Sequence, residues 1–102
     1  MAKKKKKSRR ASDNVFRDLG FKPEDAENLR VRADLMIALS TLIEDRGLTQ
    51  VQAAKLLGVT QPRVSDLVRG KIERFSIDTL IAMLGAAGVQ VRVTTQERAR
   101  VA

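Results

Sequence analysis

The segment that most constrains the fold runs from Thr49 to Gly70, with the sequence TQVQAAKLLGVTQPRVSDLVRG. Thr49 and Gln52 have the spacing of a capping box, in which each side chain pairs with the other residue's backbone N–H. Gly58 follows about two helical turns later, where only glycine takes a left-handed backbone conformation at low cost. The pattern predicts a short helix over residues 50–57 that ends in a tight turn.

A second short helix is predicted directly after this turn, over residues 61–69. Thr60 can cap it, and Pro62 falls in its first turn, where no backbone N–H is needed. Val64 and Leu67 are three residues apart and face the core. Two short helices joined in this way form a helix-turn-helix, the arrangement that places a helix in the DNA major groove.

The outer face of the second helix is polar and mostly basic. Its side chains are donors that suit bases and phosphates, with one acidic exception at Asp66. The alternative is an ordinary helical hairpin with a solvated outer face, but the two caps and the donor-rich face favour the helix-turn-helix. The candidate contacts on this face are Gln61, Arg63, Ser65 and Arg69.

Composition excludes several classes of function. The chain has no Cys and no His, so it lacks a thiolate metal site and the commonest general base. It also shows no paired carboxylates and no glycine-rich phosphate loop. We therefore expect a non-enzyme without metal or cofactor. No stretch approaches the roughly 18 apolar residues of a membrane span, so we expect a cytoplasmic protein without membrane contact.

The net charge of +8 is concentrated at the N-terminus. Lys3 to Lys7, Arg9 and Arg10 carry seven positive charges, whereas the remainder has 13 basic and 12 acidic side chains. Residues 1–12 are therefore expected to form a basic, disordered arm. Either this arm adds phosphate contacts on nucleic acid, or it only solubilises the chain.

Residues 13–22, DNVFRDLGFK, form a short apolar segment with two of the three aromatic side chains of the protein. Asp13 could cap a single helical turn and Gly20 could end it, but so short a helix does not fold alone. The segment must dock, either onto its own domain or onto a partner protein. In the second case its contacts would be Val15, Phe16, Leu19 and Phe21.

Two further helices are predicted on either side of the central motif. A long amphipathic helix is expected from about Glu24 to Arg46, with Pro23 at its start. Another is expected over residues 77–87, with Ser76 as its cap. The inner face of this last helix is predicted to comprise Ile77, Leu80, Ile81 and Leu84.

The segment after the last helix has the pattern of a strand. Val89, Val91 and Val93 alternate with polar residues, which is the period of a half-buried strand. One strand is not stable alone, and the sequence offers no second candidate. We therefore expect this strand to pair with the same strand of another copy, giving a homodimer. Residues 96–102 are expected to form a flexible tail.

Taken together, these features resemble a known family. The long helix, the 49–70 segment and the last helix look like the Xre/Cro-type helix-turn-helix domain of lambdoid phage repressors. Over about residues 13–94 the chain is similar to the HigA-like Xre-family antitoxins of type II toxin–antitoxin modules. The most specific pieces are GLTQ–AA–LLGV–QPRVSDL–RGK and the following FSIDTL. The lysine run is not part of this pattern.

The resemblance implies a fold class and a domain boundary. The expected fold is an all-α, lambda-repressor-like helix-turn-helix bundle of four to five helices. A short C-terminal strand would pair in a dimer. The DNA-binding and dimerisation domain would occupy residues 23–95.

The family pattern also assigns roles to residues. Gln50 would hold a phosphate and brace Gln61. Phage repressors often have polar residues where this chain has Pro62 and Asp66, so contact at the proline would be apolar. Asp66 could accept from cytosine N4, but pairing with Arg63 or Arg69 is favoured, because an unpaired carboxylate near phosphate is costly. The predicted DNA contacts are Gln50, Thr60, Gln61, Pro62, Arg63, Ser65, Arg69 and Lys71.

The resemblance predicts a dimeric antitoxin. In that family the antitoxin represses its own operon at a palindromic operator in double-stranded DNA. It also neutralises a RelE/HigB-type toxin that cuts mRNA on the ribosome. One alternative is a stand-alone Xre-family transcriptional regulator or prophage repressor without a toxin. Another is a protein-interaction module that uses the helix-turn-helix only as a scaffold.

Overall fold

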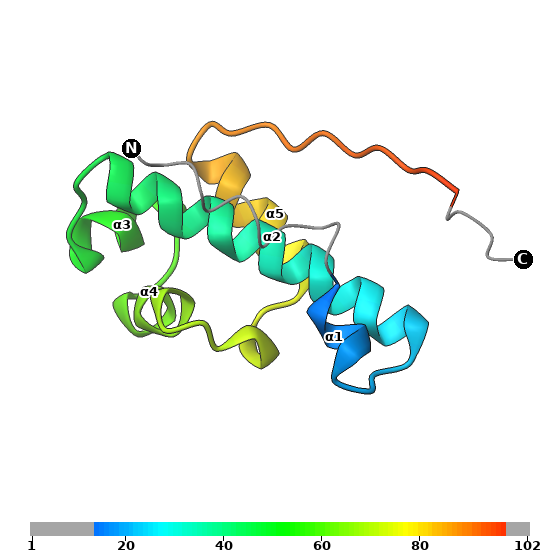
Figure 1. Ribbon diagram of the computed structural model, residues 1–102. Helices are drawn as coiled ribbons and strands as arrows, with labels where there is room; N and C mark the ends of the chain where they lie inside the picture. The colour runs from blue at the N-terminus through cyan, green and yellow to red at the C-terminus, as the bar shows by residue number, and fades with distance from the viewer. Residues whose placement is uncertain (1–13, 98–102) are drawn as a thin grey trace, which may run out of the picture.

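The computed structural model describes residues 14–97, and Figure 1 shows how its helices are arranged. The predicted basic arm, residues 1–12, and the end of the predicted tail, residues 98–102, lie outside the described residues. The described part contains five α-helices and one short 3-10 helix, so the prediction of an all-α bundle is confirmed. In chain order they are α1 (Val15–Asp18), α2 (Pro23–Asp45), α3 (Gln50–Leu57), α4 (Gln61–Val68), η2 (Ile72–Arg74) and α5 (Ile77–Ala86).

The long helix α2 organises the fold. Elements α1, α4, η2 and α5 pack against it, and α3 packs against α4 and α5. Figure 1 shows α1 at one end of α2 and α3 at the other. Within residues 14–97, no helix combines the length and the apolarity that crossing a membrane requires. The core comprises Met36, Leu39, Ile43, Ala53, Ala54, Leu57, Val64, Leu67, Phe75, Leu80, Met83, Leu84 and Ala87.

The predicted helix starts are confirmed by their caps. Thr49 Oγ1 accepts from Gln52 N at 3.1 Å, while Thr49 N donates to Gln52 Oε1 at 2.9 Å, which completes the capping box. The side chains of Thr60 and Ser76 cap α4 and α5 by accepting from Arg63 N and Thr79 N. Gly58 has a φ of 71°, the left-handed conformation expected at the turn between α3 and α4.

Several predicted boundaries need small corrections. Helix α2 begins at Pro23 and ends at Asp45, α4 ends at Val68, and α5 ends at Ala86. The cap predicted at Asp13 lies outside the described residues. The side chain of Asn14 caps α1 instead, accepting from Phe16 N at 3.1 Å.

The inner face of α5 also differs from the prediction. Ile81 is 40% exposed, whereas Met83, which was not predicted, is buried. Phe75, just before α5, is one of the largest fully buried side chains. With Ser76 as N-cap, Phe75 and Leu80 occupy the two positions of a hydrophobic staple, and both are buried. This spacing was visible in the sequence and would have predicted Phe75 as a core residue.

Within residues 14–97, the segment predicted as a strand has no strand partner. In the described part, residues 88–97 are neither helix nor strand, and Figure 1 shows them running away from α5 as an extended segment. Val89 and Val91 are half-buried against the core, but Val93 is 74% exposed. Pairing with a second copy therefore stays a prediction.

Candidate nucleic-acid interface

The exposed side of α4 is the candidate interface. Val64 and Leu67 on its inner side are fully buried, so the helix is fixed against the core. Thr60, Gln61 and Pro62 at its start are exposed, as is Arg69 just after its end. The other four predicted contacts are half-buried, namely Gln50, Arg63, Ser65 and Lys71.

Most of these side chains have no partner within the described residues. The side chains of Gln61 and Arg69 make no hydrogen bond and no ion pair with any residue in the 14–97 range. The same is true of Gln50, so the predicted bracing of Gln61 by Gln50 is not made in the free chain. Donors without an internal partner can bond bases and phosphates without first breaking a bond inside the protein.

Basic side chains follow α4 directly. Gly70 has a φ of 74°, and its N–H donates to Leu67 O at 3.0 Å. Lys71 N donates to Asp66 O at 3.0 Å, which completes a Schellman motif. This turn places Arg69 and Lys71 beside the C-terminal carbonyls of α4, at the edge of the candidate interface.

Arg63 differs from its neighbours, because the chain itself engages it. Its Nη1 donates to Arg74 O at 2.9 Å, and its guanidinium carbon lies 4.7 Å from the centroid of the Phe75 ring. This is the geometry of a cation–π contact. Arg63 was predicted as a contact to phosphate or base, and the structure gives it an intramolecular role.

Asp66 is paired, but not with the predicted partner. Its Oδ2 accepts from Arg74 Nη1 at 3.2 Å, and its side chain is 16% exposed. The prediction that Asp66 would be neutralised is confirmed, and the choice of Arg63 or Arg69 as its partner was wrong. Arg74 takes this place because the turn after α4 carries it back across that helix.

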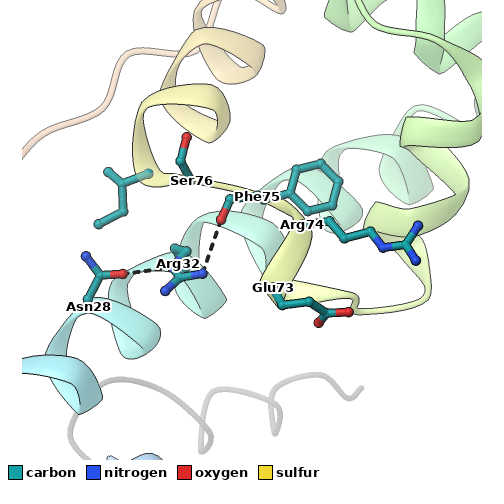
Figure 2. Close-up of a pocket in the computed structure, with 7 residues that line it drawn as sticks. Asn28, Arg32, Glu73, Arg74, Phe75 and Ser76 are labelled. Atoms are coloured by element: carbon teal, nitrogen blue, oxygen red, sulfur yellow. Dashed lines mark hydrogen bonds between the residues drawn. The ribbon is translucent and has the colours of Figure 1, made fainter. Parts of the chain in front are cut away.

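A polar groove lies on the other side of the same turn. It has a volume of about 490 Å³ and is drawn in Figure 2. Arg32 of α2 lies in it, with Nε donating to Asn28 Oδ1 at 2.8 Å. Its Nη1 donates to Ile72 O at 3.2 Å and to Phe75 O at 3.3 Å. Sequence reasoning missed Arg32, because its partners lie 40 and 43 residues away.

The predicted partner-binding segment docks onto its own domain. Helix α1 packs on α2, Asn14 Nδ2 donates to Ala26 O at 3.3 Å, and Phe16 stacks edge-on against Phe21 with centroids 6.2 Å apart. Phe16 is half-buried by this packing. The remaining apolar side chains stay exposed: Val15 by 53%, Leu19 by 68% and Phe21 by 47%.

Comparison with known proteins agrees with this geometry. Residues 15–96 match a protein-family model described as a helix-turn-helix domain. A solved structure described as an XRE family transcriptional regulator is 36% identical to this chain. The match covers 76% of this chain and 90% of that chain, with a TM-score of 0.68. No curated protein matches the chain.

Proposed function

Because this chain belongs to the XRE family of helix-turn-helix transcriptional regulators, we propose that it is a sequence-specific repressor that binds its operator as a dimer. The observation that carries the proposal is the exposed edge of α4. Gln61 and Pro62 lie in one helix that buried side chains fix against the core, and Arg69 follows its last residue. The side chains of Gln61 and Arg69 make no hydrogen bond or ion pair within residues 14–97.

The proposed mechanism places α4 in the major groove. Gln61 and Ser65 would contact base edges, Pro62 would make an apolar contact, and Arg69 and Lys71 would bind phosphates. Gln50 and Thr60 would contribute from the adjoining helix starts. Two copies related by a twofold axis would present two such helices about 34 Å apart, which matches half-sites one helical turn apart on a palindrome.

The extended segment after α5 is the proposed dimer contact. Val89 and Val91 pack their side chains on their own core, and Val89 N donates to Leu84 O at 2.9 Å. From residue 90 onwards, the backbone N–H and C=O groups have no strand partner in the described chain. An unpaired edge of this kind is a template for a second strand. Pairing of two copies would satisfy these groups and would set the spacing of the two α4 helices.

A second proposed activity is neutralisation of a RelE/HigB-type toxin. Its support is the family resemblance, together with the exposed apolar side chains of Val15 in α1 and of Leu19 and Phe21 just after it. Figure 1 shows α1 at the end of α2 remote from α3. A protein bound there would leave α4 accessible, so toxin binding and DNA binding would be compatible in one complex.

Co-expression with the neighbouring gene tests both activities together. An abutting open reading frame encoding a small basic protein that co-purifies with this chain supports the antitoxin role. Operator binding without such a partner supports a stand-alone regulator. If no salt-dependent duplex binding is detected, the helix-turn-helix acts only as a scaffold, and the proposed function is wrong.

A further inference from the structure

The turn after α4 is held by side chains from two helices. We call this turn, residues 71–75, the η2 loop. Arg32 of α2 donates to the carbonyls of Ile72 and Phe75, at 3.2 and 3.3 Å. Arg63 of α4 donates to the carbonyl of Arg74, which lies between them, at 2.9 Å. Three carbonyls of one short loop therefore accept from two guanidinium groups.

The contact between α4 and the η2 loop runs in both directions. Arg63 reaches from the helix to the backbone of the loop, and Arg74 reaches from the loop to Asp66 on the helix, at 3.2 Å. The guanidinium of Arg63 also lies 4.7 Å from the centroid of Phe75, whose side chain is 1% exposed. Figure 2 shows Arg32 on α2, joined by a hydrogen bond to the carbonyl of Phe75 in the η2 loop.

We propose that Arg63 is a positioning residue for DNA recognition and not a DNA contact. Together with Phe75 and Arg32, it fixes the angle of α4 and the place of Lys71 at the edge of the interface. This role rests on the proposed function. It distinguishes Arg63 from Gln61 and Arg69, whose side chains have no partner in the described residues.

The chemistry of the contact requires arginine. A planar guanidinium can stack on a ring and donate in its own plane at the same time. A lysine at position 63 would keep the positive charge but would lose the flat stack and the fixed direction of its donors. Arg63→Lys therefore separates the role of the geometry from the role of the charge.

The expected signature is a selective loss of specific binding. Base contacts need an accurately placed helix, whereas non-specific binding needs mainly charge near the phosphates. A small rotation of α4 weakens every base contact together. Non-specific affinity and its dependence on salt should stay, because the positive charge at position 63 is kept.

The test compares Arg63→Lys with Arg17→Lys on two duplexes. One duplex is selected by the wild-type full-length chain from a random pool, and the other is a random duplex of the same length. Arg63→Lys should lose about tenfold in affinity for the selected duplex. Its affinity for the random duplex and its salt slope should be unchanged. Arg17→Lys, which changes an exposed arginine of α1 without a side-chain partner in the described chain, should stay near wild type on both.

A double-mutant cycle with Phe75→Leu separates positioning from direct contact. The buried ring of Phe75 is out of reach of DNA, so coupling between the two positions passes through their stack. We expect the double variant to bind the selected duplex about as well as either single variant. Urea unfolding confirms which variants are folded. If Phe75→Leu does not fold, Arg32→Lys replaces it in the cycle. The double variant should then bind the selected duplex about as well as Arg63→Lys or Arg32→Lys alone.

Three results would overturn the inference. The first is wild-type affinity of Arg63→Lys for the selected duplex. The second is a loss of affinity in Arg63→Lys that depends on a single base pair of the site and that adds to the loss caused by Phe75→Leu or Arg32→Lys. This is the behaviour of a base contact. The third is a wild-type chain that selects no duplex. That result rejects the proposed function as well, whereas the first two leave it standing.

Discussion

Side chains on α4 and at its C-terminal end fall into two groups that are close in sequence but differ in their partners. Arg63 and Asp66 are engaged by the η2 loop. Gln61 and Arg69 make no side-chain hydrogen bond or ion pair within residues 14–97. A side chain without an internal partner can bond a base or phosphate without first breaking another bond. Direct contribution to DNA affinity should therefore follow this division.

The strongest expectation at this scale concerns Gln61. A glutamine amide can bond an adenine edge with two hydrogen bonds, which is worth roughly 1–3 kcal/mol of discrimination. Gln61→Ala should lose that much on the preferred duplex and little on a random one, as measured by fluorescence anisotropy. Equal losses on both duplexes would show that Gln61 does not contact a base.

Two elements lie at the margins of the packed core, and each has an assigned partner in the proposed function. Helix α1 exposes apolar side chains, and residues 89–97 expose backbone without a strand partner in the described chain. Exposed groups of this kind indicate a contact surface only if the fold stays intact when they are replaced. Substitutions in either element must therefore be compared with controls that report on folding.

For α1, the informative change is Val15→Ser together with Leu19→Ser. Both side chains are more than half exposed, so the melting temperature should change little. Binding of a co-expressed toxin should be lost. Phe16→Ala is the matched control, because Phe16 is half-buried and stacks on Phe21. It should lower the melting temperature by several degrees. Full toxin neutralisation by the serine double variant would place the toxin elsewhere.

For the segment after α5, proline tests strand pairing. Proline removes a backbone donor, and successive N–H groups of a strand point to opposite edges. Arg92→Pro and Val93→Pro are therefore compared separately with Arg92→Ala and Val93→Ala. At least one proline variant should be monomeric by light scattering, while both alanine variants stay dimeric. If both proline variants remain dimers, the interface lies on another surface, such as a helix.

The number of residues between two hydrogen-bonded groups explains which of these features the sequence could predict. The caps at Thr49, Thr60 and Ser76 depend on residues three positions away, so local spacing was sufficient. The contacts of the η2 loop join residues separated by 8 to 43 positions. Nothing local distinguishes Arg63 from Arg69, and only the return of the chain past α4 gives them different roles.

At the scale of the whole molecule, α2 separates the two proposed partners. Its 23 residues span about 34 Å, with α1 near its N-terminal end and the helix-turn-helix at the other. Toxin and operator would therefore bind at opposite ends of a rigid helix. The N-terminus is a third distinct part of the sequence, because seven positive charges lie in the first ten residues.

Deleting residues 1–10 tests whether that charge contributes to DNA binding. If several of these side chains touch phosphate, the slope of log affinity against log salt should fall by roughly 0.9 for each phosphate that the arm neutralises. A variant with the same length and with glutamine in place of the lysines and arginines controls for chain length. An unchanged slope in both variants would show that the arm only solubilises the protein.

The central claim is that two copies of α4 bind one palindromic site. Footprinting of the wild-type protein on the DNA upstream of its own gene tests this claim most directly. We predict protection of two half-sites whose centres lie about 10 base pairs apart, on one face of the duplex, at concentrations that leave random DNA unprotected. A single protected half-site, or protection no stronger than on random DNA, would contradict the claim.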